Sequence, residues 1–167
     1  MRIGLIDVGG VSAGVDDMVF LIGKECGMGL RELRKRSNIT LEQLSALTGY
    51  DMPRLSRYET VDDDARNMFL GTAASLARIL HCNVLDLYPD EHVWRGGVSA
   101  GVVGLRNIRL FRGLTQTQLA GMSGVARPNI SWFETGYRPV SQMYLRTALR
   151  LSEALQCDPV DFLTEGY

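Results

Sequence analysis

The sequence predicts an all-α fold made of two tandem five-helix domains. Three observations predict it. A long stretch of the chain is repeated at a constant offset, and within each copy apolar residues recur at the spacing of helices that bury one face. Hydrophobic residues also make up 46% and charged residues 22% of the 167 residues, so each copy has enough apolar side chains for a core.

The repeat aligns residues 30–89 with residues 105–164 at a single offset and without a gap. Nineteen of the 60 aligned positions are identical, several times what chance would give. The identical pairs include Arg34/Arg109, Thr40/Thr115, Gly49/Gly124, Glu59/Glu134 and Cys82/Cys157. We therefore expect domains at 27–89 and 104–167, a linker at 90–103, and an N-terminal segment of uncertain structure at 1–26.

Two short helices open the second copy. The apolar residues of the first recur at helical spacing, and they are Leu105, Ile108 and Phe111. Thr115 begins the next helix as its N-cap, and Gln118 three residues later completes a capping box. We expect Leu119 and Met122 to face inward, and Gly124 to supply the turn that follows.

A third short helix is predicted from Arg127 to Phe133, with Pro128 tolerated in its first turn because no intrahelical donor is lost there. After a loop, Ser141 is expected to cap a longer fourth helix. The apolar stripe of that helix consists of Leu145, Ala148, Leu151 and Leu155. Asp158 caps a last turn that ends near Leu163. The first copy shows the same order, with helices at 52–58, 70–80 and 84–87.

The segments 114–120 and 124–136 together resemble the helix-turn-helix of the phage repressor and Cro-like (XRE-type) family. The resemblance covers both copies, about 120 of the 167 residues. It implies two repressor-like helix-turn-helix domains. The second helix of such a motif lies in the major groove of DNA, roughly 12 Å wide, while the first spans the phosphate backbone.

The side chains at the start of that second helix are the candidates for reading bases. Arginine matches the O6 and N7 atoms of guanine, and asparagine matches N6 and N7 of adenine, each worth about 1–3 kcal/mol of discrimination. In the second copy the candidates are Arg127, Asn129 and Trp132, the last for a thymine methyl group. In the first copy they are Met52, Arg54 and Arg57. A solvated surface charge is the alternative for Arg127.

The resemblance also implies phosphate contacts, which set the register on DNA without reading its sequence. The candidates are Thr115, Gln116, Ser131 and Arg138. For Gln116 the alternative is a capping or solvent-exposed role. The charge pattern agrees, because residues 103–138 hold five arginines against one glutamate although the whole chain has a net charge of −1.

The first copy departs from the family pattern at two places. Leu41 replaces the expected phosphate-binding glutamine, and the loop after the third helix reads Val61-Asp-Asp-Asp64. Three adjacent carboxylates would repel a phosphate backbone. We therefore expect the first copy to be a weaker reader or a protein-contact module. The rival is a second true reader whose acidic loop points away from the duplex.

The function expected from these features is sequence-specific binding of double-stranded DNA by a transcriptional regulator, most simply a repressor that reads with the second domain. One such module covers too few base pairs for a genome, so two must act together: both copies of one chain, or the second copy from each subunit of a homodimer. The alternative is an antitoxin-like or anti-activator protein that binds another protein through the first domain.

Other classes of function find little support. No paired base and nucleophile suggest an enzyme, and the three cysteines have neither a C-x-x-C element nor ligand spacing, so no cofactor or metal is expected. No apolar run approaches the roughly 18 residues of a membrane span, and we expect a cytoplasmic, nucleoid-associated protein. Residues 17–22 could form an extra helix or a dimerisation arm, and both stay open.

Overall fold

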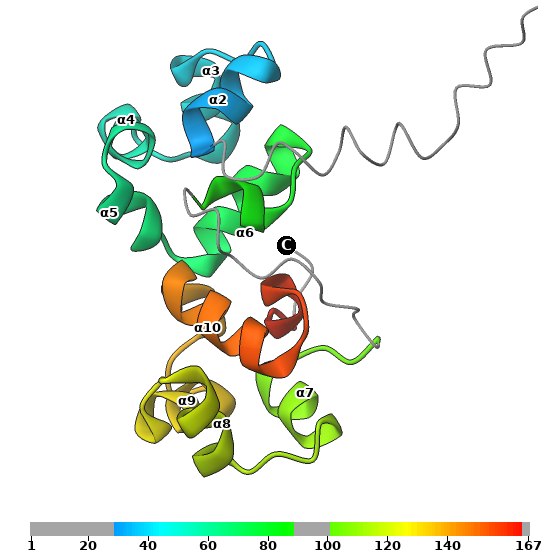
Figure 1. Cartoon of the computed structure of the whole chain (residues 1–167). Coiled ribbons are helices and arrows are strands. Elements are labelled where there is room, and N and C mark those ends of the chain that lie inside the picture. Colours follow the sequence, from blue (N-terminus) through cyan, green and yellow to red (C-terminus); the bar gives the residue numbers. More distant parts are fainter. Residues whose placement is uncertain (1–28, 89–100, 165–167) are drawn as a thin grey trace, which may run out of the picture.

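The computed structural model describes residues 29–88 and 101–164. Within these residues the regular structure is helical, and two similar groups of helices follow one another along the chain (Figure 1). The predicted all-α fold is therefore confirmed. The predicted N-terminal segment and most of the predicted linker lie outside the described residues, so the proposed domain boundaries stay predictions.

The helices of the first domain are α2 (Gly29–Arg36), α3 (Leu41–Thr48), α4 (Met52–Thr60), α5 (Asp62–Arg66), α6 (Leu70–Leu80) and the 3₁₀ turn η1 (Val84–Leu87). Those of the second are α7 (Leu105–Phe111), α8 (Gln116–Ser123), α9 (Arg127–Glu134), η2 (Val140–Gln142), α10 (Leu145–Leu155) and η3 (Pro159–Phe162). Helices α3 and α8, α6 and α10, and η1 and η3 begin and end at equivalent positions of the repeat. The duplication in sequence is thus a duplication in structure.

Local capping chemistry sets the helix starts at the same places in both domains. The Thr115 hydroxyl accepts a hydrogen bond from the backbone N–H of Gln118, whose side chain accepts one from the N–H of Thr115, and Thr40 does the same in the first domain. Asp158 caps η3 as predicted. Gly124 ends α8 with a φ of 66°, where a residue with a β-carbon is strained. These predicted caps are confirmed.

Three details of the predicted helices are wrong. Ser141 does not cap the long helix, because it lies in η2 and α10 begins only at Leu145, after Tyr144. Met122 and Phe111 do not face inward; their side chains are 60% and 61% exposed. Phe111 follows Leu105 by six residues, about 240° around a helix.

The inner side of α8 instead consists of Leu119 and Ser123, four residues apart, so Met122 falls beside it and faces solvent. The segment predicted as an acidic loop also has regular structure. Its three aspartates form the first turn of α5, where the helix dipole favours negative charge.

Each domain closes around equivalent apolar residues. In the first domain Leu33, Leu44, Leu55 and Leu76 are 6% exposed or less, and their equivalents Ile108, Leu119, Ile130 and Leu151 are 4% exposed or less. These residues come from the first, second, third and long helices of each domain. The two short helices of each motif are therefore held against a common core.

The two domains meet through residues that are equivalent in the repeat. Phe69 and Tyr144 occupy the same position of the two copies and form an isolated antiparallel bridge, and their rings stack with centroids 5.3 Å apart. The N–H of Leu70 donates to the carbonyl of Met143, and the N–H of Leu145 donates to the carbonyl of Met68, both at 2.7 Å. The second bond is the first with the domains exchanged, as expected for an approximate two-fold axis.

Candidate nucleic-acid interface

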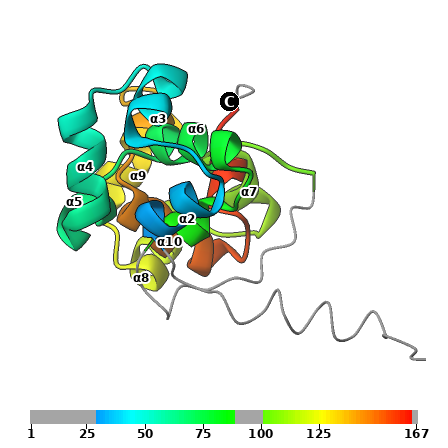
Figure 2. The same ribbon diagram turned by 90° about the horizontal axis from the view of Figure 1, so that it is seen from above.

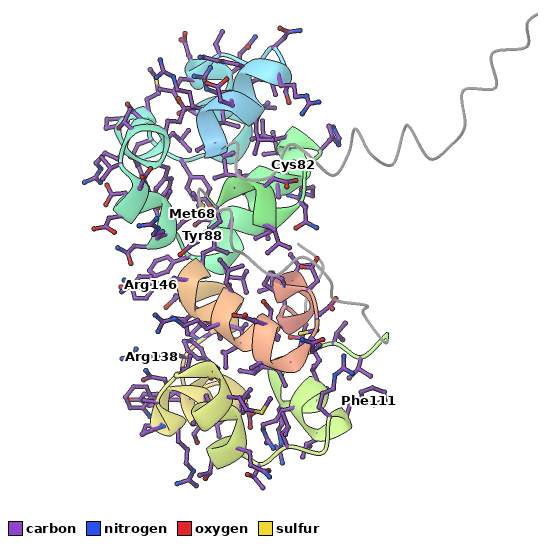
Figure 3. The ribbon with its side chains drawn as sticks, in the orientation of Figure 1. Met68, Cys82, Tyr88, Phe111, Arg138 and Arg146 are labelled. Atoms are coloured by element: carbon purple, nitrogen blue, oxygen red, sulfur yellow. The ribbon has the colours of Figure 1, made fainter. Side chains whose placement is uncertain are left out.

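The helices expected to read DNA, α4 and α9, lie on the same side of the molecule in both views (Figures 1 and 2). The arginines Arg138 and Arg146 project from this side as well (Figure 3). We call this side of the molecule, which carries α4, α9 and these two arginines, the recognition face. It brings the predicted recognition helices of both domains to one side of the molecule.

Helix α9 presents its predicted readers at its first two turns. Arg127, the first residue of the helix, is exposed, and Asn129 is half-buried beside it. Ile130, the next residue of α9, is fully buried, so it sets which side of the helix faces the core. The structure therefore leaves the Arg127 guanidinium at the surface, as base contact would require, and the contact itself stays a prediction.

The third predicted reader, Trp132, belongs to a cluster of side chains at the far end of α9. The Arg138 guanidinium carbon lies 4.7 Å from the centroid of the Trp132 ring. The backbone N–H of Arg138 also donates a hydrogen bond to the backbone carbonyl of Trp132 at 3.1 Å. Tyr137 adds a ring 6.1 Å away. A guanidinium stacked in this way keeps its N–H groups in its own plane, where a phosphate oxygen can accept from them.

A buried ion pair ties the first helix of the domain to α9. Arg109 Nε donates to Glu134 Oε1 at 2.6 Å, Nη2 donates to Oε2 at 2.8 Å, and Nη1 donates to the Leu114 carbonyl at 2.6 Å. The side chains are 8% and 2% exposed. Hydrogen bonding to Glu134 raises the pKa of Arg109. This pair positions the recognition helix.

Gln116, a predicted phosphate contact, joins this pair. Its amide donates to Glu134 Oε2 at 2.9 Å, which leaves the second N–H and the carbonyl of the amide for other partners. Burial by itself raises the pKa of Glu134. The hydrogen bonds from Arg109 and Gln116 and the charges of Arg109 and Arg106 outweigh it, so the pKa of Glu134 lies below its ordinary value.

The first domain repeats the ion pair in a more exposed form. Arg34 bonds Glu59 through Nε and through Nη2, the latter at 3.0 Å, and the side chains are 15% and 6% exposed. Leu41 occupies the position of Gln116, so the glutamate has no amide partner there. These pairs were not predicted from the sequence, although an arginine and a glutamate, identical in both copies and equally spaced in each, were a usable signal.

The two predicted arginine readers of α4 contact other side chains of their own domain. Arg54 Nε donates to the Tyr58 hydroxyl at 2.8 Å, and its guanidinium lies over the Tyr50 and Tyr58 rings at 5.2 and 5.6 Å. The bond to Tyr58 raises the pKa of Arg54. Arg57 Nε lies 3.8 Å from Asp64 Oδ2 on an exposed surface. Met52 is 43% exposed and free to make apolar contacts.

Helix α5 places one aspartate next to Arg57 and pairs a second within the helix itself. Asp64 faces Arg57, and Asp63 Oδ1 lies 4.0 Å from Arg66 Nη1. Two of the three aspartates are therefore close to a guanidinium, which reduces the negative potential that a phosphate backbone would meet. Exposed pairs of this kind are weak and can rearrange.

The two remaining predicted phosphate contacts, Thr115 through its hydroxyl and Ser131 through its backbone carbonyl, form hydrogen bonds within the domain. The Thr115 hydroxyl lies in the capping box of α8 and also donates to Gln118 Oε1 at 2.9 Å. Ser131 is half-buried on α9, and its carbonyl accepts from the Thr135 hydroxyl at 2.8 Å. Both residues lie in the helix-turn-helix, and their contact with phosphate stays a prediction.

The described residues contain no group of three or more histidine, cysteine or acidic side chains that could hold a metal ion. Among the same residues, no helix is long and apolar enough to cross a membrane. Cys82 is half-buried and Cys157 is buried, and burial raises the pKa of their thiols to about 11 and about 12. Both thiols act as small packing groups.

Comparison with known families matches both halves of the chain separately. A Cro/C1-type helix-turn-helix DNA-binding domain matches residues 29–91, and a helix-turn-helix family matches residues 105–162. Searches among curated proteins and among solved structures gave no significant match. The Cro/C1-type match falls on the first domain, the one with the acidic helix, so that domain too has the fold of a DNA-binding module.

The two matched segments coincide with the two structural domains, and in each the second and third helices form the helix-turn-helix held by its buried Arg–Glu pair. The chain belongs to the XRE-type helix-turn-helix family of DNA-binding transcription regulators, and it carries two domains of that family in tandem.

Proposed function

We propose that the chain is a repressor that binds a short operator and reads it mainly with α9 of the second domain. The observation that carries this choice is the contrast between the two recognition helices. Arg127 stands exposed at the start of α9, whereas Arg54 on α4 is bonded to Tyr58 and stacked on two tyrosine rings. An arginine that is already packed must give up these contacts before it can pair with guanine.

Four features support phosphate contacts around α9. Gln116 and Thr115 begin α8, Ser131 lies on α9, and Arg138 follows it, stacked on Trp132. Occupation of such a site would exclude RNA polymerase from an overlapping promoter, which is the simplest route to repression. A protein of this function acts where the DNA is, in the cytoplasm at the nucleoid.

Selection of the purified chain against a random duplex library at near-physiological salt tests the proposal. A recovered motif is expected, and Arg127→Ala should relax the preference at one base position at a cost of about 1–3 kcal/mol. Equal loss of affinity for all sequences would show that Arg127 contacts only phosphate. Failure to enrich any sequence would refute the DNA-reading function.

The second candidate is a protein partner bound through the first domain. The exposed, acidic surface of α5 favours it, because aspartates suit a basic protein better than a phosphate backbone. Salt concentration separates the two functions, because the affinity of a protein for DNA falls steeply as salt rises, and more steeply when more phosphates are contacted. Formation of a homodimer also stays a prediction, and the molecular mass of the protein in solution tests it.

A further inference from the structure

We propose that one chain takes the place of a repressor dimer and binds, as a monomer, an operator with two unlike half-sites in inverted orientation. The inference rests on the proposed function in one respect, that the chain reads DNA. It adds the number of chains on the operator, the orientation of the half-sites and the fixed distance between them. The contacts at the domain junction carry it.

The junction has the symmetry of an isologous dimer interface, in which residue i of one partner contacts residue j of the other and j contacts i. Leu70 contacts Met143 and Leu145 contacts Met68 through the same backbone bond. Phe69 pairs with its own equivalent, Tyr144, and therefore marks the position of the axis. Phe69 and Tyr144 occupy the same position of the repeat, so an axis that relates these two residues also relates the two whole domains.

A further contact obeys the same rule at a distance from the bridge. The Asn83 amide donates to Asp158 Oδ2 at 3.4 Å, and these residues are again equivalent in the repeat, each the N-cap of the last turn of its domain. Equivalent ends of the two domains thus face each other. A tandem arrangement related by translation would place unlike residues at the junction instead.

An axis that relates the two domains also relates α4 to α9, because these helices occupy the same place in the repeat. Both lie on the recognition face, as two recognition helices of a dimeric repressor must. B-DNA has its own local two-fold axes perpendicular to the helix, so the two axes can coincide. The half-sites are then inverted and roughly 10 base pairs apart from centre to centre.

The two half-sites differ because the two recognition helices differ. At three equivalent positions α4 carries Met52, Arg54 and Arg57, while α9 carries Arg127, Asn129 and Trp132. At each of these three positions the two helices present different side chains to DNA. The operator is therefore two-fold in geometry and asymmetric in sequence.

The junction is close-packed, which fixes the distance between the readers. Met68, Leu70, Met143 and Leu145 are fully buried. A β-carbon added at Gly71 would lie 3.0 Å from Ser141 Cβ and 3.1 Å from the Ser141 carbonyl oxygen, so the backbones meet without room for a side chain. Two domains on a flexible tether would tolerate many spacings, whereas this packing permits one.

The test uses the full chain and the site recovered from the duplex selection. Three duplexes carry its two halves as recovered, with one half reversed into a direct repeat, and with five base pairs inserted between the halves. We expect one chain per duplex by light scattering of the complex. We also expect reversal and insertion each to lower affinity roughly 100-fold or more. Each change lets only one domain bind at a time, so the gain in affinity from two linked binding sites is lost.

A junction variant gives an independent measurement. Gly71→Val is expected to broaden the tolerated spacing while both domains keep their cores, and Gly121→Ala is its control because a β-carbon there meets nothing within 4 Å. Equal binding to all three duplexes by the unchanged chain would overturn the inference. So would a true palindrome occupied by two chains, although DNA reading itself would then stand. A selection without any enriched sequence would remove the proposed function as well.

Discussion

Removing the Glu134 carboxylate should destabilise the chain far more than an average substitution. Glu134→Ala would leave the Arg109 guanidinium, 8% exposed, without its two carboxylate bonds. Breaking a buried pair by removing one partner costs about 3–5 kcal/mol. With a urea dependence of about 2 kcal/mol/M, the unfolding midpoint should fall by roughly 1.5–2.5 M.

The measurement is urea unfolding followed by circular dichroism, with three comparisons. Glu59→Ala should cost less, since that pair is more exposed and has no glutamine partner. Glu32→Ala, which removes a surface pair with Lys35 at 3.2 Å, should change stability by no more than about 0.5 kcal/mol. The double variant Arg109→Met with Glu134→Leu should recover most of the loss, because it removes both charges.

A loss below about 1 kcal/mol for Glu134→Ala would refute this reasoning, because it is the size expected for a hydrated surface pair. An equally large loss at Glu32 would do so too, since it would show that exposure does not decide the cost. The recognition helix also depends on this pair. Variants that keep the fold but lose the pair should therefore bind DNA less well than their stability alone predicts.

Three further predictions concern pH, salt and thiol chemistry. The pKa of Glu134 is lowered in the folded chain, so its stabilisation is present above the ordinary pKa of about 4.5 and is lost as the pH falls through the folded value. The stability advantage over Glu134→Gln should therefore shrink as the pH is lowered below about 4.5. Arg146 projects from the recognition face near the domain junction, where it can contact a phosphate. Arg146→Ala should therefore weaken binding to all sequences and reduce the slope of log affinity against log salt concentration by about 1 in magnitude. A change in base preference would contradict a phosphate role. Burial raises the pKa of Cys82 to about 11 and that of Cys157 to about 12. Both thiols should therefore react with iodoacetamide at pH 8 far more slowly than free cysteine. Equal rates would show that burial does not protect them.

Much of the fold was predictable because its signals are local. The capping boxes at Thr40 and Thr115 act between residues three apart, and the left-handed glycine of the helix-turn-helix acts through its own backbone. The repeat then transferred each assignment from one copy to the other. Periodicity failed where a helix was short: over seven or eight residues Phe111 and Met122 fit an apolar pattern that packing did not use.

From the sequence, the residues of the candidate site could be predicted, but not the contacts that their side chains make. Sequence placed Arg127 and Arg54 near the starts of two equivalent recognition helices, and the family resemblance supplied their expected role. Their different states depend on neighbours: Arg54 is bonded to Tyr58, and Arg127 is exposed. The Arg109–Glu134 pair joins residues on different helices, and its burial could not be known before the helices were packed.

The sequence by itself determined two all-α repressor-like domains, because helix periods, caps and an internal repeat are properties of neighbouring residues and of the chain compared with itself. Only the tertiary structure decided that the domains face each other through equivalent residues. The exchange of backbone bonds around Phe69 and Tyr144 needs two surfaces that complement each other in three dimensions. A linear repeat permits translation or rotation equally, and the packing of the junction selects the rotation.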